Sequence, residues 1–105
     1  MANVTATIAI IAKIPLREGH RDSAAEAIQT MLDHVETEEG TLTYILHTDD
    51  RDTNLLWFYE QYADRDSFKA HGSSDVMKAL GPVLADHLAG RPELIHLTPI
   101  GGKGL

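Results

Sequence analysis

Two segments of alternating apolar and polar residues, joined by a short polar turn, constrain the fold of this chain more than any other feature. Leu42–Thr48 and Leu55–Tyr62 both have the two-residue period of strands, and only the six residues 49–54 separate them. So short a connection favours an antiparallel hairpin, because parallel strands need a longer crossover. Asp64 follows at the position of a helix N-cap. The stretch therefore predicts a hairpin and then a short helix that carries Phe68 and His71.

The flanking sequence completes one βαββαβ unit. Thr5–Ile14 is rich in β-branched residues and predicts a first strand that Pro15 ends. A helix ending near Gly40 is predicted by apolar residues at helical spacing, namely Ala24, Ile28, Met31, Leu32 and Val35. A second such stripe predicts the last helix, and consists of Val76, Met77, Leu80, Val83, Leu84 and Leu88. Pro82 should bend that helix or split off its final turns. Leu94–Thr98 predicts the fourth strand.

The length and composition favour one α+β domain, which must contain both the core and any functional site. We expect a single domain over residues 1–105, with residues 100–105 as a flexible tail. No apolar run approaches the roughly 20 residues that span a bilayer, so no membrane partner is expected. The N-terminus has no basic segment before its apolar run, which predicts a cytoplasmic protein.

The charged residues and the lack of cysteine exclude several classes of site. The net charge is −7, and the nine lysines and arginines are scattered, so nucleic acid is not an expected partner. Without cysteine the chain has no disulfide, thiolate metal site or iron–sulfur cluster. Its histidines form no His-x-His or His-x-x-x-His pair, and no glycine-rich phosphate motif precedes a helix. We therefore expect neither a metal nor another cofactor.

The expected sheet has a second face that needs a cover. If the helices pack on one face of four strands, the apolar side chains of the other face would be left in water. A second copy of the chain would bury them, so we predict a homodimer whose sheets pack face to face with isologous symmetry.

Short motifs along this order of elements resemble one known family. They are Gly40-x-Leu42-x-Tyr44, then Tyr59-Glu60-x-Tyr62-x-Asp64, then Ala70-His71-x-x-Ser74. In this order and spacing they resemble the antibiotic biosynthesis monooxygenase (ABM) domain family, in its small stand-alone quinol-monooxygenase-like branch. The resemblance runs from the first strand to Pro99.

The resemblance implies a ferredoxin-like monomer with a four-stranded antiparallel sheet, paired into a dimeric α/β barrel. In several members it also implies oxygenation of phenolic or quinol-like substrates without flavin, haem or metal. The same fold includes haem degraders and isomerase-like proteins, so the fold alone does not set the activity. Haem-degrading relatives carry an Asn, a Trp and a His at positions that correspond here to Ala12, Tyr62 and Gly81, which disfavours haem degradation.

Cofactor-free oxygenation needs a base, because a deprotonated, electron-rich substrate can give an electron to molecular oxygen. His71 is the candidate base, since an ordinary imidazole titrates near pH ~6.5; the alternative is a histidine that only interacts with the helix dipole. Glu60 lies in an apolar strand, where it would orient His71, act as another base, or make a structural hydrogen bond to backbone or lysine. Tyr44 is the candidate hydroxyl donor to a developing oxyanion.

Aromatic side chains are the candidate walls of a substrate pocket: Trp57, Tyr59, Tyr62 and Phe68. Strand alternation places Trp57 and Tyr59 on one sheet face and Tyr62 on the other, so they cannot all line one pocket. It does not say which face holds the pocket, and the core or a dimer interface is the alternative role for each aromatic.

The leading hypothesis is a dimeric, cofactor-independent monooxygenase that uses molecular oxygen to convert a small phenolic or quinol-like aromatic substrate into a quinone. Two alternatives use the same apolar cavity: a small-molecule-binding protein without redox turnover, and an isomerase-like enzyme that moves a proton and consumes no oxygen. The sequence does not separate the three.

Overall fold

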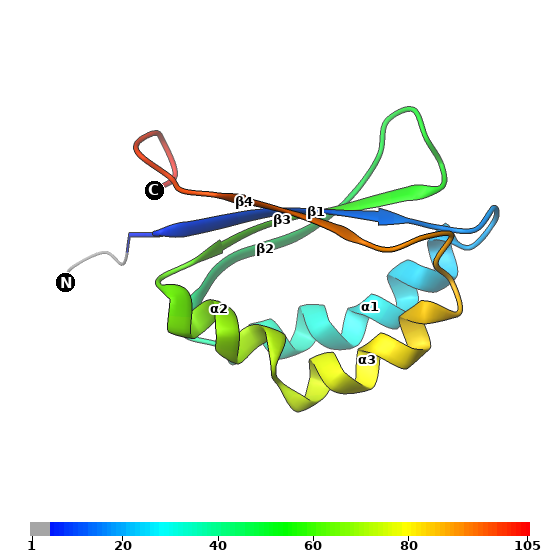
Figure 1. Cartoon of the computed structure of the whole chain (residues 1–105), viewed down its shortest axis with the longest axis horizontal. Helices are drawn as coiled ribbons and strands as arrows, with labels where there is room; N and C mark the ends of the chain where they lie inside the picture. The colour runs from blue at the N-terminus through cyan, green and yellow to red at the C-terminus, as the bar shows by residue number, and fades with distance from the viewer. Residues whose placement is uncertain (1–4) are drawn as a thin grey trace.

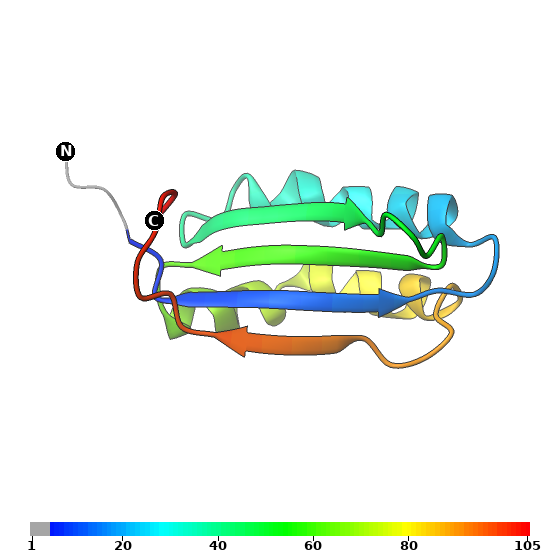
Figure 2. The same ribbon diagram turned by 90° about the horizontal axis from the view of Figure 1, so that it is seen from above.

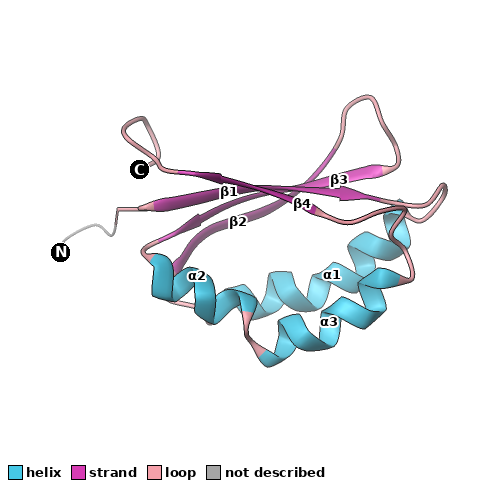
Figure 3. Ribbon diagram, in the orientation of Figure 1, coloured by secondary structure: helices cyan, strands magenta, loops and turns pink. Residues whose placement is uncertain are grey.

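A four-stranded antiparallel sheet carries all three helices on one face in the computed structural model, which describes residues 5–105 (Figure 1, Figure 3). In chain order the elements are β1 (Ile8–Pro15), α1 (Arg21–Val35), β2 (Thr41–Thr48), β3 (Leu55–Tyr62), α2 (Arg65–Gly72), α3 (Asp75–Ala85) and β4 (Glu93–Leu97). The strands lie in the order β2-β3-β1-β4, which Figure 2 shows from above. This arrangement confirms the predicted ferredoxin-like α+β fold.

The boundaries differ from the sequence expectations where local pattern and tertiary structure disagree. β1 begins at Ile8 rather than Thr5, and α1 ends at Val35, because a turn in which the Glu38 amide donates to the Val35 carbonyl leads into β2. α3 ends at Ala85, one turn after Pro82. Leu88 is therefore outside the helix, against our expectation, and forms an isolated antiparallel bridge with Leu16.

The core lies between the sheet and the helices. Its fully buried side chains come from the sheet and from α1, and the largest are Tyr62, Ile10, Ile28, Met31 and Leu56. Leu80 brings α3 into the same cluster. Val83 was expected on that apolar stripe, but it is 52% exposed because it lies on the outer side of α3. In the described part of the chain, no helix is long and apolar enough to cross a membrane.

The opposite sheet face has no helix over it. Cross-strand register aligns one apolar row on this face, Ile45, Tyr59, Ile11 and Ile95. Ile45 is 51% exposed and Ile95 is 40% exposed. The segment after β4 turns back on this side of the sheet, beside Ala9 and Tyr59 (Figure 1). We call this helix-free side of the sheet, which carries the row Ile45, Tyr59, Ile11 and Ile95, the open face.

Candidate active site

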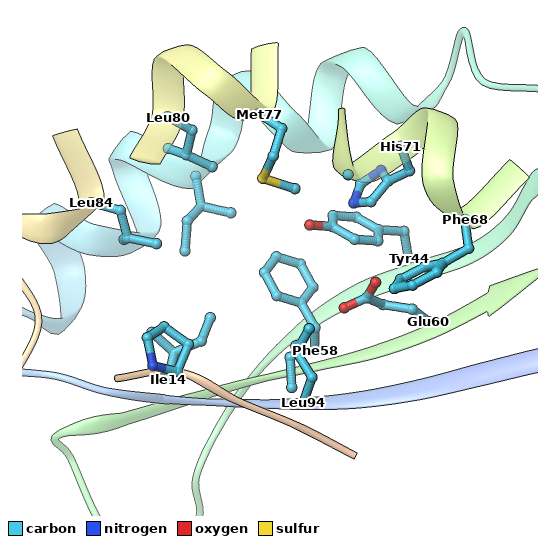
Figure 4. A pocket seen from close by; sticks show the side chains of 14 residues that line it. Ile14, Tyr44, Phe58, Glu60, Phe68, His71, Met77, Leu80, Leu84 and Leu94 are labelled. Atoms are coloured by element: carbon cyan, nitrogen blue, oxygen red, sulfur yellow. The ribbon is translucent and has the colours of Figure 1, made fainter. Parts of the chain in front are cut away.

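A cavity of about 380 Å³ lies between the sheet and the helices. Polar side chains enter it from three elements: Tyr44 from β2, Glu60 from β3 and His71 from α2 (Figure 4). The rest of the lining is apolar or glycine, and consists of Ala12, Ile14, Ile28, Phe58, Phe68, Gly72, Met77, Leu80, Leu84, Pro92 and Leu94. The fold thus gathers the three residues that the sequence analysis named as catalytic candidates into one largely apolar space.

The local structure of α2 places His71 at the cavity. Asp64 caps the helix as predicted, with its carboxylate accepting from the Ser67 amide at 2.8 Å. His71 follows in the last turn and is only 3% exposed. Its Nδ1 lies 2.9 Å from Oε1 of Glu38. The ring contacts Tyr44 and Tyr62, with centroid distances of 4.8 and 5.4 Å, so the imidazole is held on two sides.

Tyr44 presents a protonated hydroxyl to the cavity. Its ring stacks on Phe58 with a centroid distance of 4.3 Å, and its oxygen points into the cavity (Figure 4). Burial raises the pKa of Tyr44 above its ordinary value, and the nearby carboxylates of Glu60 and Glu38 raise it further. The phenol therefore remains a hydrogen-bond donor at neutral pH.

Glu60 is a carboxyl group in an apolar setting. It is 5% exposed, and its Oε1 accepts a hydrogen bond from the Tyr62 hydroxyl at 2.5 Å. Burial raises the pKa of Glu60, although the Tyr62 hydrogen bond and the proximity of His71 and His96 partly offset this. The sequence analysis offered a hydrogen bond from Glu60 to backbone or lysine, or a contact that orients His71. Among the residues described, the side-chain hydrogen bond of Glu60 is instead with Tyr62, and the His71 Nδ1 contact is with Glu38. The Glu60 carboxyl group faces the cavity while Oε1 is held by the Tyr62 hydroxyl (Figure 4).

The predicted aromatic walls are divided between three places. Phe68 lines the cavity, whereas Tyr62 lies behind the lining, fully buried, and packs on Phe68 with a centroid distance of 5.2 Å. Trp57 and Tyr59 belong to the open face, as strand alternation requires once Glu60 faces the helices. There the Trp57 indole donates to Asp49 Oδ2 at 2.9 Å, and Lys13 Nζ lies 5.8 Å from the ring centroid. These two aromatics do not line the cavity.

Glu38 is the important site residue that the sequence analysis missed. It lies in the connection between α1 and β2, in a Glu-Glu-Gly run where a solvated glutamate is the ordinary expectation. Its contact with His71 joins residues that are 33 positions apart, and no local pattern reports a contact over that distance. Within residues 5–105, no group of three or more histidine, aspartate or glutamate side chains is placed to hold a metal ion.

A ferredoxin-like sheet and helix layer around an apolar cavity with converging acid–base groups define a small-molecule-binding domain. The sequence model of the antibiotic biosynthesis monooxygenase family matches residues 7–81. The chain belongs to this family. None of the curated proteins compared with the chain matches it.

Solved structures show the same fold. A candidate antibiotic biosynthesis monooxygenase from Caulobacter crescentus CB15 has a TM-score of 0.86 at 23% identity, with 93% of each chain covered. PA3566 from Pseudomonas aeruginosa has a TM-score of 0.83 at 20% identity, covering 95% of this chain and all of the other. Rv0793 from Mycobacterium tuberculosis has a TM-score of 0.83 at 21% identity, covering 92% of this chain and 98% of the other. At these identities the similarity extends to the fold and not to the substrate.

Proposed function

We propose that this protein is a cofactor-independent monooxygenase that oxidises a small phenolic or quinol-like aromatic compound to a quinone. The observation that carries the proposal is the convergence of His71, Tyr44 and Glu60 in an otherwise apolar cavity. Such a cavity accepts a flat apolar ring, and its polar groups meet the substrate hydroxyl. Membership of the monooxygenase family supports the same chemistry.

The proposed reaction begins with proton removal. Nε2 of His71 takes the phenolic proton, and the Tyr44 hydroxyl donates to the resulting oxyanion. The anion gives one electron to molecular oxygen, and the two radicals combine at the ring carbon opposite the oxyanion to form a peroxide. His71 returns its proton to the peroxide, and cleavage of the O–O bond, with loss of the hydrogen from that carbon as a proton, gives the quinone and water. A phenol or anthrone with hydrogen at that carbon and one O₂ thus yield one quinone and one H₂O, with no external reductant. A hydroquinone, which carries oxygen at that carbon, instead loses two hydrogens to O₂ and yields the quinone and H₂O₂.

Oxygen uptake by metal-stripped protein tests this function. We expect uptake above the spontaneous rate for members of a panel of hydroquinones, naphthoquinols and anthrones. His71→Ala should reduce that rate roughly 100-fold or more, because a positioned general base contributes about 10²–10⁴-fold. His47→Ala is the matched control, since His47 lies across from Trp57 on the open face of the sheet and does not line the cavity. It should leave uptake unchanged.

The alternatives give different results in the same assay. If no compound is consumed but several raise the thermal midpoint, the cavity binds these molecules without oxygen turnover, and the monooxygenase proposal is wrong for this panel. If a compound is isomerised at the same rate without oxygen, His71 and Glu60 move a proton within the substrate instead.

We also propose that the protein is a homodimer that pairs through the open face. The row formed by Ile45, Tyr59, Ile11 and Ile95 supplies an apolar surface on all four strands. Isologous pairing would bury this row against its own copy.

A further inference from the structure

Glu38 joins three elements around one carboxylate. Its Oε1 lies 2.9 Å from His71 Nδ1 of α2 and accepts from the Thr41 hydroxyl of β2 at 2.8 Å. Its Oε2 lies 3.3 Å from Nε2 of His34 on α1. The Glu38 side chain is only 15% exposed, so solvent competes weakly for these contacts. Both carboxylate oxygens are thus engaged, and the group has little freedom to rotate.

This arrangement selects one tautomer of His71. An ionised carboxylate can only accept hydrogen bonds, so a neutral His71 that bonds Glu38 must carry its proton on Nδ1. Its Nε2 then holds the lone pair. Nε2 has no hydrogen-bond partner among the described residues. Every fully buried side-chain nitrogen or oxygen in that part of the chain has a partner, so Nε2 is not fully buried. Because His71 lines the cavity, Nε2 opens to it. Flipping the ring by 180° would keep its packing on Tyr44 and Tyr62 but would place a carbon at Glu38 and break that hydrogen bond.

We infer that Glu38 is a positioning residue that holds His71 in the Nδ1-protonated tautomer and directs a basic Nε2 into the cavity. Its role in proton abstraction rests on the proposed function, whereas the tautomer assignment rests on the geometry alone. Once Nε2 has taken a proton from the substrate, the carboxylate would also stabilise the imidazolium through a charge-assisted hydrogen bond. Thr41 and His34 act through Glu38, by keeping its carboxylate in place.

The test is the tautomer of His71, read by nitrogen NMR on protein with ¹⁵N-labelled histidine. In the wild-type protein at neutral to mildly alkaline pH, His71 should show a protonated Nδ1 and an unprotonated Nε2. Glu38→Gln should lose this preference, because the glutamine amide can donate to Nδ1 as well as accept from it. Glu39→Gln removes the same charge from the adjacent, exposed residue and should leave the spectrum unchanged.

Oxygen uptake on the panel above gives the second measurement. Glu38→Gln should lower the maximal rate by about 10-fold or more with a smaller change in KM, since it disturbs the base and not the cavity walls. Glu39→Gln should retain the wild-type rate.

The outcomes separate the two proposals. A changed tautomer in Glu38→Gln, with no oxygen uptake by any form, would support the positioning role and reject the monooxygenase function. An Nε2-protonated His71 in the wild-type protein would overturn the positioning role without any variant, so the test does not depend on whether Glu38→Gln folds. An unchanged tautomer in a folded Glu38→Gln would overturn it as well.

Discussion

Glu38 and Glu60 show how the fold gives one side-chain type two roles. Glu38 satisfies its carboxylate with His71, Thr41 and His34 at the rim of the helical layer. Glu60 lies deeper and has the Tyr62 hydroxyl as its hydrogen-bond donor, so burial dominates and its pKa is raised. One carboxylate therefore orients the candidate base, while the other faces the cavity with an increased affinity for a proton.

The raised pKa of Glu60 predicts how stability depends on pH. Below the ordinary carboxyl value of 4.5, Glu60 is protonated in both the folded and the unfolded state, and burial costs little. As pH rises toward the higher folded pKa, the unfolded chain releases its proton first, so the folded state loses relative stability. Glu60→Gln removes this loss and keeps an acceptor for Tyr62. The variant should therefore gain stability over the wild type as pH rises from about 4 to about 7.

Urea unfolding of both proteins across this pH range provides the measurement. Glu26→Gln, on the exposed side of α1, is the control and should show a nearly constant difference from wild type. A difference between Glu60→Gln and wild type that is flat, or that shrinks with rising pH, would show that burial does not raise the Glu60 pKa.

The functional role of a residue could be predicted from the sequence only where the residue type is unusual for its local setting or belongs to a motif. Glu60 stands out because it is an acid in an apolar strand, and His71 because it lies near the end of a capped helix and within a motif that resembles the family. Glu38 is not unusual among its polar neighbours. Its role depends on the packing of α2 against the connection before β2, which local sequence does not encode.

At the scale of elements, most boundaries follow from capping and helix-breaking residues in the sequence. The Asp64 and Ser74 side chains cap α2 and α3, so the break between these helices lies where Gly72 and two serines predict it. Leu88 shows where such reasoning fails. Its spacing continues the stripe of α3, but its apolar character serves a bridge to Leu16 beyond the helix end. Periodicity cannot distinguish these two reasons for burial.

Gly40 predicts a steric coupling between the connection that precedes β2 and helix α2. A Cβ on Gly40 would overlap the Oγ and the Cβ of Ser67, and the Gly40 carbonyl accepts from the Ala63 amide at 2.9 Å. Gly40→Ala should therefore lower the free energy of unfolding by about 1–3 kcal/mol through overpacking. Ser67→Gly removes the obstructing atoms, so the double variant should be more stable than the sum of the two single effects predicts.

Urea unfolding of the four proteins in this double-mutant cycle measures the coupling. Ser67→Ala is the matched comparison, because it removes the Oγ but retains the Cβ, and it should relieve the clash only in part. Gly72→Ala, where an added Cβ meets nothing within 4 Å, should cost little. Strict additivity between Gly40→Ala and Ser67→Gly would contradict the proposed contact.

At the scale of the whole molecule, the two faces of the sheet carry different surfaces. Strand alternation in the sequence separates Trp57 and Tyr59 from Phe58 and Glu60, but it does not identify the face that the helices cover. That choice depends on how the helices pack, and the structure places Phe58 and Glu60 beneath them. The cavity is therefore formed within one chain, and the open face remains available for another chain.

The apolar open face predicts a homodimer that a charged side chain introduced on this face should dissociate. Ile45 is 51% exposed in the single chain, so lysine there should leave the monomer fold intact. In a face-to-face dimer, Ile45→Lys and Ile95→Lys would bury unpaired ammonium groups in an apolar interface, at a cost that favours dissociation. Val83→Lys is the matched control, because Val83 is 52% exposed but lies on α3, on the other side of the molecule.

Sedimentation equilibrium distinguishes the outcomes. The wild type and Val83→Lys should have twice the mass of the chain, whereas Ile45→Lys combined with Ile95→Lys should shift toward the monomer. Because the cavity lies on the helical side, a folded monomeric variant should still bind the compounds that stabilise the wild type. A wild-type monomer would reject the dimer, and a double variant that remains dimeric would place the interface away from the open face. Loss of binding on dissociation would show that the partner chain helps to shape the site.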